Sequence, residues 1–405
     1  MRDVRRANRS SLLTDLFHGG RQSRQQLGDT TALSQASVSN LVGEMIEEGL
    51  VEEAGLVGSD GGRPRALLRV APGYGYVVGA DLGETRVSVE LYDLAMSRLG
   101  SAVYPLADPS DHQRATRLLM QGLSDTSAQA GIDPGEVIGY GVGVIGVVDR
   151  AGLVHSQTTS WDAVPLGEVL GAATGLPVFV ENGAKTVGQA EMWFGAGRGA
   201  RHAVIVMIGR GVGAAVVRDG RGQGRPDSGA GEWGHTMLVY EGLPCRCGAR
   251  GCLEAYIGSD GVSARLAEAM GVEYDPRLLA RTLTGELPAA AATVVAETVG
   301  YLGAGISNLV NLFSPERIVL GGPIGAALGE RFLPEIRASA AEHSLRQPYS
   351  TTRIDVCQLG PDAVAMGAAT LPLARLLADG GMAVTDSHTV VSRAAHRRQI
   401  SRIRS

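Results

Sequence analysis

The chain has 405 residues, of which 57 are glycine, and 44% of it is hydrophobic. A chain of this length is too long to fold around one ordinary hydrophobic core, so we expect two or three domains. The composition fits a soluble α/β protein. The net charge of −5 excludes a uniformly basic nucleic-acid binder, although a local basic region is compatible with it. No apolar run reaches the ~20 residues that cross a membrane, and the arginine-rich N-terminus lacks the apolar stretch of a signal peptide. We therefore expect a cytoplasmic protein.

Residues 1–72 have the pattern of a winged helix-turn-helix domain. Apolar residues recur at helical spacing over residues 10–18 and predict a first helix. Ser23 and Gln26 have the spacing of a capping box before a second helix, and Ser34 is placed to cap a third. A generic helical bundle or a protein-interaction module is the alternative.

The third predicted helix has the properties of a DNA recognition helix. Its buried stripe would comprise Val38, Leu41, Val42 and Met45. The residues exposed near its N-terminal end would be Gln35, Ala36, Ser37, Ser39 and Asn40. Small polar side chains at this end of a helix suit contact with base edges in the major groove. We predict these five residues as DNA contacts.

A basic segment, Gly61-Gly62-Arg63-Pro64-Arg65, follows the predicted wing, and no acidic residue lies between Gly61 and Val70. A slim extended segment can place the guanidinium groups of Arg63 and Arg65 in the minor groove, where the negative potential is strong. A plain interdomain linker is the alternative, and the two interpretations are compatible.

Residues after 73 have an α/β pattern. Strands are predicted at residues 76–80 and 87–91, and a buried strand lies in residues 141–148. Alanine- and glycine-rich helices are predicted at residues 302–312 and 363–377, with close helix–sheet packing. Cys357 is predicted to be a core thiol within a strand.

Three of the four cysteines lie near one histidine in the sequence. The residues that could bind a metal together are His235, Cys245, Cys247 and Cys252. One imidazole and three thiolates suit a closed tetrahedral zinc site, whose role is structural because no position remains for a reactive water. A disulfide or inert buried thiols are the alternatives, but a disulfide is not expected in a reducing cytosol.

Two carboxylates flank the predicted metal ligands. Glu232 lies three residues before His235, and Glu254 lies two residues after Cys252. With the second ring nitrogen of His235, they would form a pocket rich in hydrogen-bond acceptors, which suits the hydroxyl groups of a sugar. Solvated surface carboxylates are the alternative.

The segment Glu232-Trp233-Gly234-His235 and residues 245–254 resemble the signature of the ROK family, which contains bacterial sugar kinases and sugar-responsive repressors. The resemblance implies a sugar pocket, a structural zinc ion and a two-lobed actin-like ATPase fold of the hexokinase, Hsp70 and ribonuclease-H type. The first lobe would comprise residues 73–181, completed by a helix at 363–378. The second lobe, residues 182–362, would carry the zinc motif and an oligomerisation surface. Residues 379–405 are expected to form a basic, disordered tail.

Three positions depart from the pattern of the kinase members. Glu84 replaces the second glycine of the first phosphate loop, Arg210 replaces a small hydroxyl residue of the second, and Gly183 replaces the aspartate that acts as general base. Asn182, in the preceding position, keeps a donor and an acceptor for a sugar hydroxyl. The resemblance thus implies a sugar site formed by Asn182, Glu232, His235 and Glu254, with no catalytic residue and no expected binding of ATP.

We therefore predict a sugar-responsive DNA-binding regulator, with repression as the favoured action, of genes for carbohydrate uptake or catabolism. It would bind operator DNA as a homodimer or tetramer, and a sugar or sugar derivative would modulate it. One alternative is an ATP-dependent ROK-type sugar kinase that carries a DNA-binding domain. Another is an interaction protein regulated by a protein partner, and activation rather than repression is also open.

Overall fold

The computed structural model describes residues 2–57, 65–219, 221–222 and 231–382. The chain forms two compact units. One comprises Met1–Tyr74 with Leu373–Ser405, and the other is Gly75–Pro372. Arg63, and the part of the predicted tail after residue 382, lie outside the described residues.

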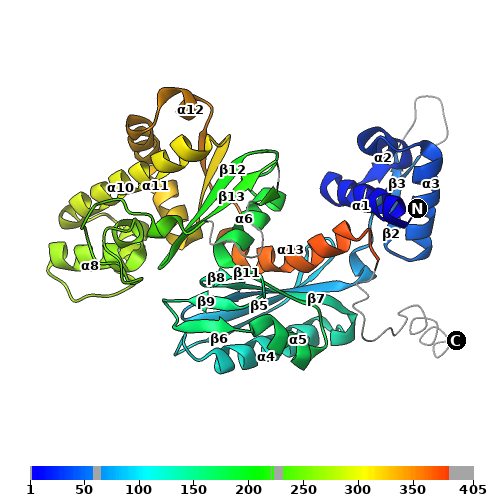
Figure 1. Ribbon diagram of the computed structural model, residues 1–405, viewed down its shortest axis with the longest axis horizontal. Coiled ribbons are helices and arrows are strands. Elements are labelled where there is room, and N and C mark those ends of the chain that lie inside the picture. Colours follow the sequence, from blue (N-terminus) through cyan, green and yellow to red (C-terminus); the bar gives the residue numbers. More distant parts are fainter. Residues whose placement is uncertain (1, 58–64, 220, 223–230, 383–405) are drawn as a thin grey trace. The chain divides into compact units, whose positions relative to one another are not determined.

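The first unit combines three helices with a small antiparallel sheet. The helices are α1 (Arg2–Gly19), α2 (Arg24–Thr31) and α3 (Gln35–Glu47), and the strands are β1 (Gln22–Ser23), β2 (Val51–Val57) and β3 (Arg65–Val70) (Figure 1). β3 lies between the other two strands, and Arg65 is opposite Val57. Arg65 is therefore the first residue of a paired strand, whereas the rest of the predicted basic segment lies outside the described residues.

Local capping residues define the helices of this unit as predicted. Ser23 and Gln26 form a complete capping box on α2, and the Ser34 hydroxyl accepts the N–H of Ser37 at the start of α3. The buried residues of α3 are the four of the predicted stripe, Val38, Leu41, Val42 and Met45. α1 begins at Arg2, well before the predicted residue 10. Its first turn is polar and carries Asp3, whose charge favours a helix N-terminus, so apolar spacing did not reveal it.

Arg9 of α1 binds the end of the last helix, α13 (Ala363–Ala378). Its Nε donates a hydrogen bond of 2.8 Å to the carbonyl oxygen of Gly380, and its Nη1 donates one of 2.9 Å to Glu48. Arg9 is only 4% exposed, and a guanidinium is buried at acceptable cost only when it is paired in this way. Gly380, just after α13, thus belongs to the packing of the first unit.

Two five-stranded sheets form the second unit, and they have the same strand order. The first sheet has the order β11-β7-β4-β5-β6 and comprises β4 (Tyr76–Leu82), β5 (Arg86–Asp93), β6 (Arg98–Pro105), β7 (Val137–Val144) and β11 (Val178–Asn182). The second has the order β14-β13-β12-β15-β16 and comprises β12 (Ala203–Ile208), β13 (Val212–Arg218), β14 (Arg221–Gly222), β15 (Arg317–Gly321) and β16 (Arg353–Val356). In each sheet the three strands that come first along the chain are antiparallel neighbours. The two strands that come later along the chain join in parallel, after helical crossovers. This duplication is the architecture predicted as actin-like.

Helices cover both faces of the first sheet. α4 (His112–Ala130) and α5 (Leu166–Thr174) lie on one face, and α13 lies across the other (Figure 1). Two glycines allow α13 to approach closely. A Cβ on Gly79 would lie 1.9 Å from the carbonyl oxygen of Ala365, and one on Gly141 would lie 1.8 Å from that of Ala368. The close helix–sheet contact expected from the alanine and glycine content is present.

Alternate side chains of β12 point to opposite faces of the second sheet and pack into two different parts of the hydrophobic core. Val204 and Val206 pack with α10 (Ala289–Phe313) and α11 (Gly322–His343), whereas Ile205 packs on the side of α6 (Gly183–Phe194). The remaining helices are α7 (Glu254–Ile257), α8 (Ser259–Met270), α9 (Leu278–Thr284) and α12 (Arg346–Ser350). A small third sheet contains β8 (Val147–Val148), β9 (Val154–Ser156) and β10 (Trp161–Val164).

α10 and Cys357 bear on two sequence expectations. α10 is long and apolar enough to cross a membrane by length and composition, and it is the one such helix in the described residues, although half of its most apolar window is buried within the protein. Its apolar residues form the core with α11, and this packing accounts for its composition. Cys357 lies just after β16 rather than within it, and burial raises the pKa of its thiol to about 11, as in a partly buried core position.

The close contact between β7 and α13 predicts a large difference between two glycine substitutions. Gly141→Ala should lower the free energy of unfolding by about 1–3 kcal/mol, because the added methyl group overlaps the backbone of Ala368. Gly300→Ala is the matched control, since nothing lies within 4 Å of its Cβ position in α10, and it should raise stability by about 0.5–1 kcal/mol. Urea denaturation of both variants measures the difference, and equal stabilities would contradict the packing described here.

Candidate functional site

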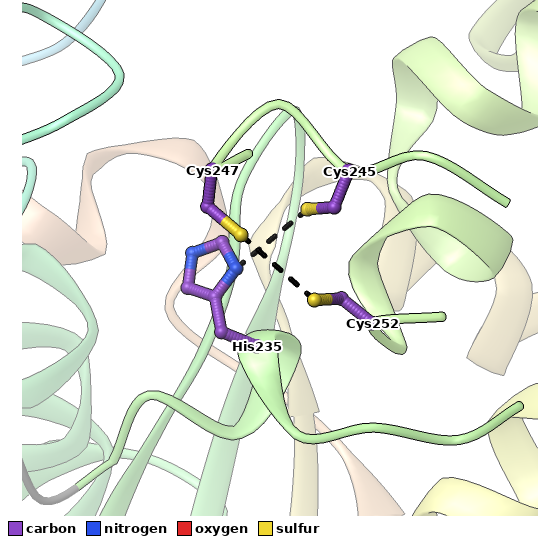
Figure 2. Close-up of side chains that lie close together, drawn as sticks. All are labelled: His235, Cys245, Cys247 and Cys252. Atoms are coloured by element: carbon purple, nitrogen blue, oxygen red, sulfur yellow. Dashed lines mark hydrogen bonds between the residues drawn. The ribbon is translucent and has the colours of Figure 1, made fainter. Parts of the chain in front are cut away.

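His235 and three cysteines gather at one point of the second unit. The Nδ1 of His235 lies 3.8 Å from the sulfur of Cys245, and the sulfurs of Cys247 and Cys252 are also 3.8 Å apart. Figure 2 shows the four side chains converging from the turn that carries His235 and from the loop that follows it. All four ligand atoms lie within 4.8 Å of one another, so the four residues of the sequence motif share one site.

Tight turns bring these residues together. His235 ends a short 3-10 helix, Trp233–His235, and Cys252 pairs with Met237 in an isolated bridge. Gly248 and Gly251 both adopt positive φ angles, of 92° and 77°, a conformation that glycine adopts without strain. The loop therefore reverses direction between Cys245 and Cys252.

The donor set fits a tetrahedral metal site. A tetrahedron with metal–sulfur bonds of ~2.3 Å has sulfur–sulfur edges of about 3.8 Å, and this equals the distance between the sulfurs of Cys247 and Cys252. Burial raises the pKa of the Cys245 thiol to about 12, so its thiolate form requires a cation beside it. The residues present can hold a metal ion of the zinc type.

Glu254 is a buried carboxylate that connects this loop to a second one. It is 5% exposed and begins α7. Its Oε2 accepts the backbone N–H of Val212 at 2.9 Å, and its Oε1 accepts a hydrogen bond of 3.0 Å from Nε of Arg246. Both oxygens thus have protein partners, which position Glu254 beside the cysteines of the candidate metal site.

Glu232 is half-buried and lies in the electrostatic field of three other residues. Burial raises the pKa of Glu232, the charges of His235 and Lys185 lower it, and the charge of Glu254 raises it. The structure therefore brings Glu232, His235 and Glu254 together. It also adds Lys185, which was not predicted as a site residue. Its position three residues after Asn182, on the same side of a helical turn, is the sequence signal that could have indicated it.

Asn182 caps α6 with its side chain. Its Oδ1 accepts the N–H groups of Ala184 at 2.8 Å and Lys185 at 3.3 Å, and its Nδ2 donates to the carbonyl oxygen of Gly146 at 2.8 Å. One amide hydrogen remains for another acceptor. Gly183 is the first residue of α6, and a Cβ there would make only ordinary contacts, at 3.5 and 3.7 Å. The glycine is therefore not required by packing.

Glu84 and two arginines form an ion-pair cluster next to Glu254. Arg210 Nη1 lies 2.6 Å from one oxygen of Glu84, and Arg246 Nη1 lies 2.6 Å from the other. Arg210 also contacts Asp260 at 2.9 Å. Glu84 and Arg210 stand out in the sequence as two separate departures from the kinase pattern. Arg246, which lies between Cys245 and Cys247, was not predicted as part of the site.

Most of the predicted DNA contacts are exposed. On α3, Gln35, Ala36, Ser39 and Asn40 are exposed and Ser37 is half-buried. Arg65 is exposed at the start of β3. The described residues therefore present these side chains to solvent in the first unit.

Comparisons with known proteins agree with this architecture. Residues 77–375 match the ROK family. The xylose repressor of Caldicellulosiruptor bescii is 25% identical over 388 residues, which cover 92% of this chain and 97% of that protein. A glucokinase of Halalkalibacterium halodurans is 30% identical over 312 residues, which cover 72% of this chain and 93% of the kinase. A solved ROK family transcriptional regulator, a homologue of the Escherichia coli MLC protein, matches with a TM-score of 0.77 and 25% identity, and covers 93% of this chain and 98% of its own.

The family match spans both five-stranded sheets and every residue of the site from Asn182 to Glu254. The mixed α/β actin-like fold predicted from the sequence is confirmed by this match and by the solved relatives. The chain belongs to the ROK family.

Proposed function

We propose that this protein is a sugar-responsive transcriptional repressor. The observation that carries the proposal is the extent of the matches. The xylose repressor and the ROK transcriptional regulator match over 92% and 93% of this chain, whereas the glucokinase matches over 72%. The part of this chain that the regulators match and the glucokinase does not is long enough to hold the first unit. A kinase does not need this unit of three helices and a small sheet.

The first unit would bind operator DNA as a winged helix-turn-helix. α3 would enter the major groove, with β2 and β3 as the wing, and the side chains offered to base edges would be Gln35, Ala36, Ser37, Ser39 and Asn40. Arg65, on the strand that leads from the wing, would contact the DNA backbone or minor groove, as would Arg63. Two copies in a homo-oligomer would read the two halves of a palindromic operator.

The second unit would bind the sugar. Glu232, His235 and Glu254 would form the sugar site with Asn182, which caps α6, because the hydroxyl groups of a sugar need such acceptors and donors. The sugar would weaken operator binding only through a different affinity for two conformations of the protein. The expected coupling is about 1–3 kcal/mol.

The metal site would be structural. Zinc suits three thiolates and one imidazole, and a zinc ion held by His235, Cys245, Cys247 and Cys252 would fix the loop that carries the sugar-binding residues. His235 would bind the metal through Nδ1, the nitrogen that faces Cys245, and would keep Nε2 for the sugar.

A sugar kinase is the second candidate, because kinases are also among the relatives. Gly183 cannot accept a proton, and general-base catalysis typically contributes about 10²- to 10⁴-fold to a rate. Glu84, on the first phosphate loop, adds a negative charge where a kinase needs to accept phosphates. We therefore propose that the protein is not an enzyme.

The metal proposal predicts that Cys245→Ser loses bound zinc and binds its sugar at least about tenfold more weakly, because the loop around His235 is no longer fixed. Cys357→Ser is the control and should keep both, since Cys357 lies outside the cluster. Elemental analysis gives the metal content, and calorimetry with the best ligand from a thermal-shift panel of sugars gives the affinity. Wild-type protein without zinc, purified from zinc-replete cells, would rule out the metal proposal.

The catalytic proposal predicts no sugar-dependent ATP turnover near the ~1–100 s⁻¹ of kinases. Gly183→Asp should fold as the wild type does, because the site has room for a Cβ and an acidic residue is favourable in the first turn of a helix. It should still lack kinase activity while Glu84 is present. A coupled ATPase assay across the same sugar panel measures both proteins, and turnover at kinase rates by the wild type would establish the second candidate.

The DNA proposal predicts different effects for two substitutions in the first unit. Asn40→Ala should relax selection at one base position, at a cost of about 1–3 kcal/mol if the contact is bidentate. Arg65→Ala should weaken binding to all operators and reduce its salt dependence. Arg117→Ala, an exposed arginine of α4 in the other unit, is the control for charge. Operator titrations at several salt concentrations measure these effects, and wild-type binding by Asn40→Ala and Arg65→Ala would exclude this face as the DNA surface.

A further inference from the structure

The two sheets of the second unit carry equivalent loops that meet. Residues 83–85 join β4 to β5, and residues 209–211 join β12 to β13, which are the first two strands of each sheet. Glu84 and Arg210 are the middle residues of these loops, and their charged groups lie 2.6 Å apart. The duplicated halves of the fold thus contact each other through one loop that is negative and one that is positive.

Glu84 is held on both oxygens. Arg210 contacts its Oε2, and Arg246 contacts its Oε1, each at 2.6 Å. The side chain of Glu84 is only 11% exposed. Gly211 leaves room for this arrangement, because a Cβ at that position would lie 3.1 Å from Nη2 of Arg246. One carboxylate therefore lies between two guanidinium groups that point toward the same place.

The two arginines are anchored independently of Glu84. Arg210 is held by Asp260, with hydrogen bonds of 3.0 and 2.9 Å, and Arg246 is held by Glu254 at 3.0 Å. Each of these carboxylates balances one arginine, so Glu84 adds a further negative charge to a cluster that is neutral without it. Removal of Glu84 should leave both guanidinium groups in place, charged and with unused donors.

We propose that Arg210 and Arg246 form a binding site for a phosphoryl group and that Glu84 occupies this site as an internal ligand. Guanidinium groups bind carboxylate and phosphate oxygens with the same donor geometry, so a carboxylate on the facing loop can take the place of a phosphate. Because Glu84 is attached to the chain, it competes at a high effective concentration with any phosphate in solution. Glu84 thereby excludes phosphate-bearing ligands from this part of the protein, whether or not the chain binds DNA.

The test is phosphate binding by full-length, metal-replete protein at low ionic strength. Inorganic phosphate and ATP are titrated separately by calorimetry into the wild type, Glu84→Gly and Glu84→Gln. Wild-type protein should bind both ligands weakly or not at all. Both variants should bind inorganic phosphate at least about tenfold more tightly than the wild type, because two charged donors become available. The glutamine variant keeps the size of the side chain, so it reports on charge even if the glycine variant folds poorly.

Two further variants identify the arginines as the site. Adding Arg210→Gln to Glu84→Gln should return phosphate affinity to the wild-type level. Glu297→Gln removes another carboxylate of this unit, one that pairs with Arg265 at 3.1 Å, and should leave phosphate binding as in the wild type. The proposal fails if folded Glu84→Gln binds inorganic phosphate no more tightly than the wild type. It also fails if only ATP binding improves and Arg210→Gln does not reverse the gain, because the nucleoside would then be the group recognised.

Discussion

The buried carboxylate of Glu254 needs hydrogen-bond partners, and this need determines how the cysteine loop, β13 and Glu84 are arranged. A buried charge without partners is strongly destabilising. Glu254 finds its partners in the backbone N–H of Val212 and in the side chain of Arg246. These two groups come from the first residue of β13 and from the cysteine loop, so one carboxylate fixes two segments that the chain order separates. Arg246 then extends the same network to Glu84 in the first sheet.

The departures from the kinase pattern at Gly183 and Glu84 are compatible with the ROK fold. The change at Gly183 removes a proton acceptor but leaves the start of α6 and the cap by Asn182 in place. The charge at Glu84 does not disrupt the fold, because Arg210 and Arg246 neutralise it. Both departures from the kinase pattern are therefore compatible with a fold that keeps Asn182 and Glu254 in well-bonded positions.

The features that could be predicted are those that depend on residues close together in the sequence. The capping box at Ser23, the buried stripe of α3 and the strands predicted at residues 76–80 and 87–91 follow from spacing within a few positions, and each was found in the structure close to its predicted place. The clustering of the four metal-ligand residues was also predictable, because cysteine and histidine at such spacing have few other uses. Arg246 pairs with Glu84 across 162 positions and Arg9 binds Gly380 across 371. Such contacts depend on the tertiary fold, and no local pattern in the sequence indicates them.

The hydrogen bond of Arg9 involves the chain next to α13, the helix that contributes residues to both units. The chain passes between its two units at residues 74–75 and again within α13, whose residues up to Pro372 belong to the second unit and whose later residues belong to the first. The earlier part of α13 packs tightly against the first sheet beside Gly79 and Gly141, and a closely packed interface shifts between discrete arrangements instead of deforming gradually. The carbonyl group of Gly380, two residues after the end of α13, accepts a buried hydrogen bond from Arg9 in the first unit. One helix is therefore built into the packing of both units, through the glycine contacts of its earlier part and the residues that follow its later part.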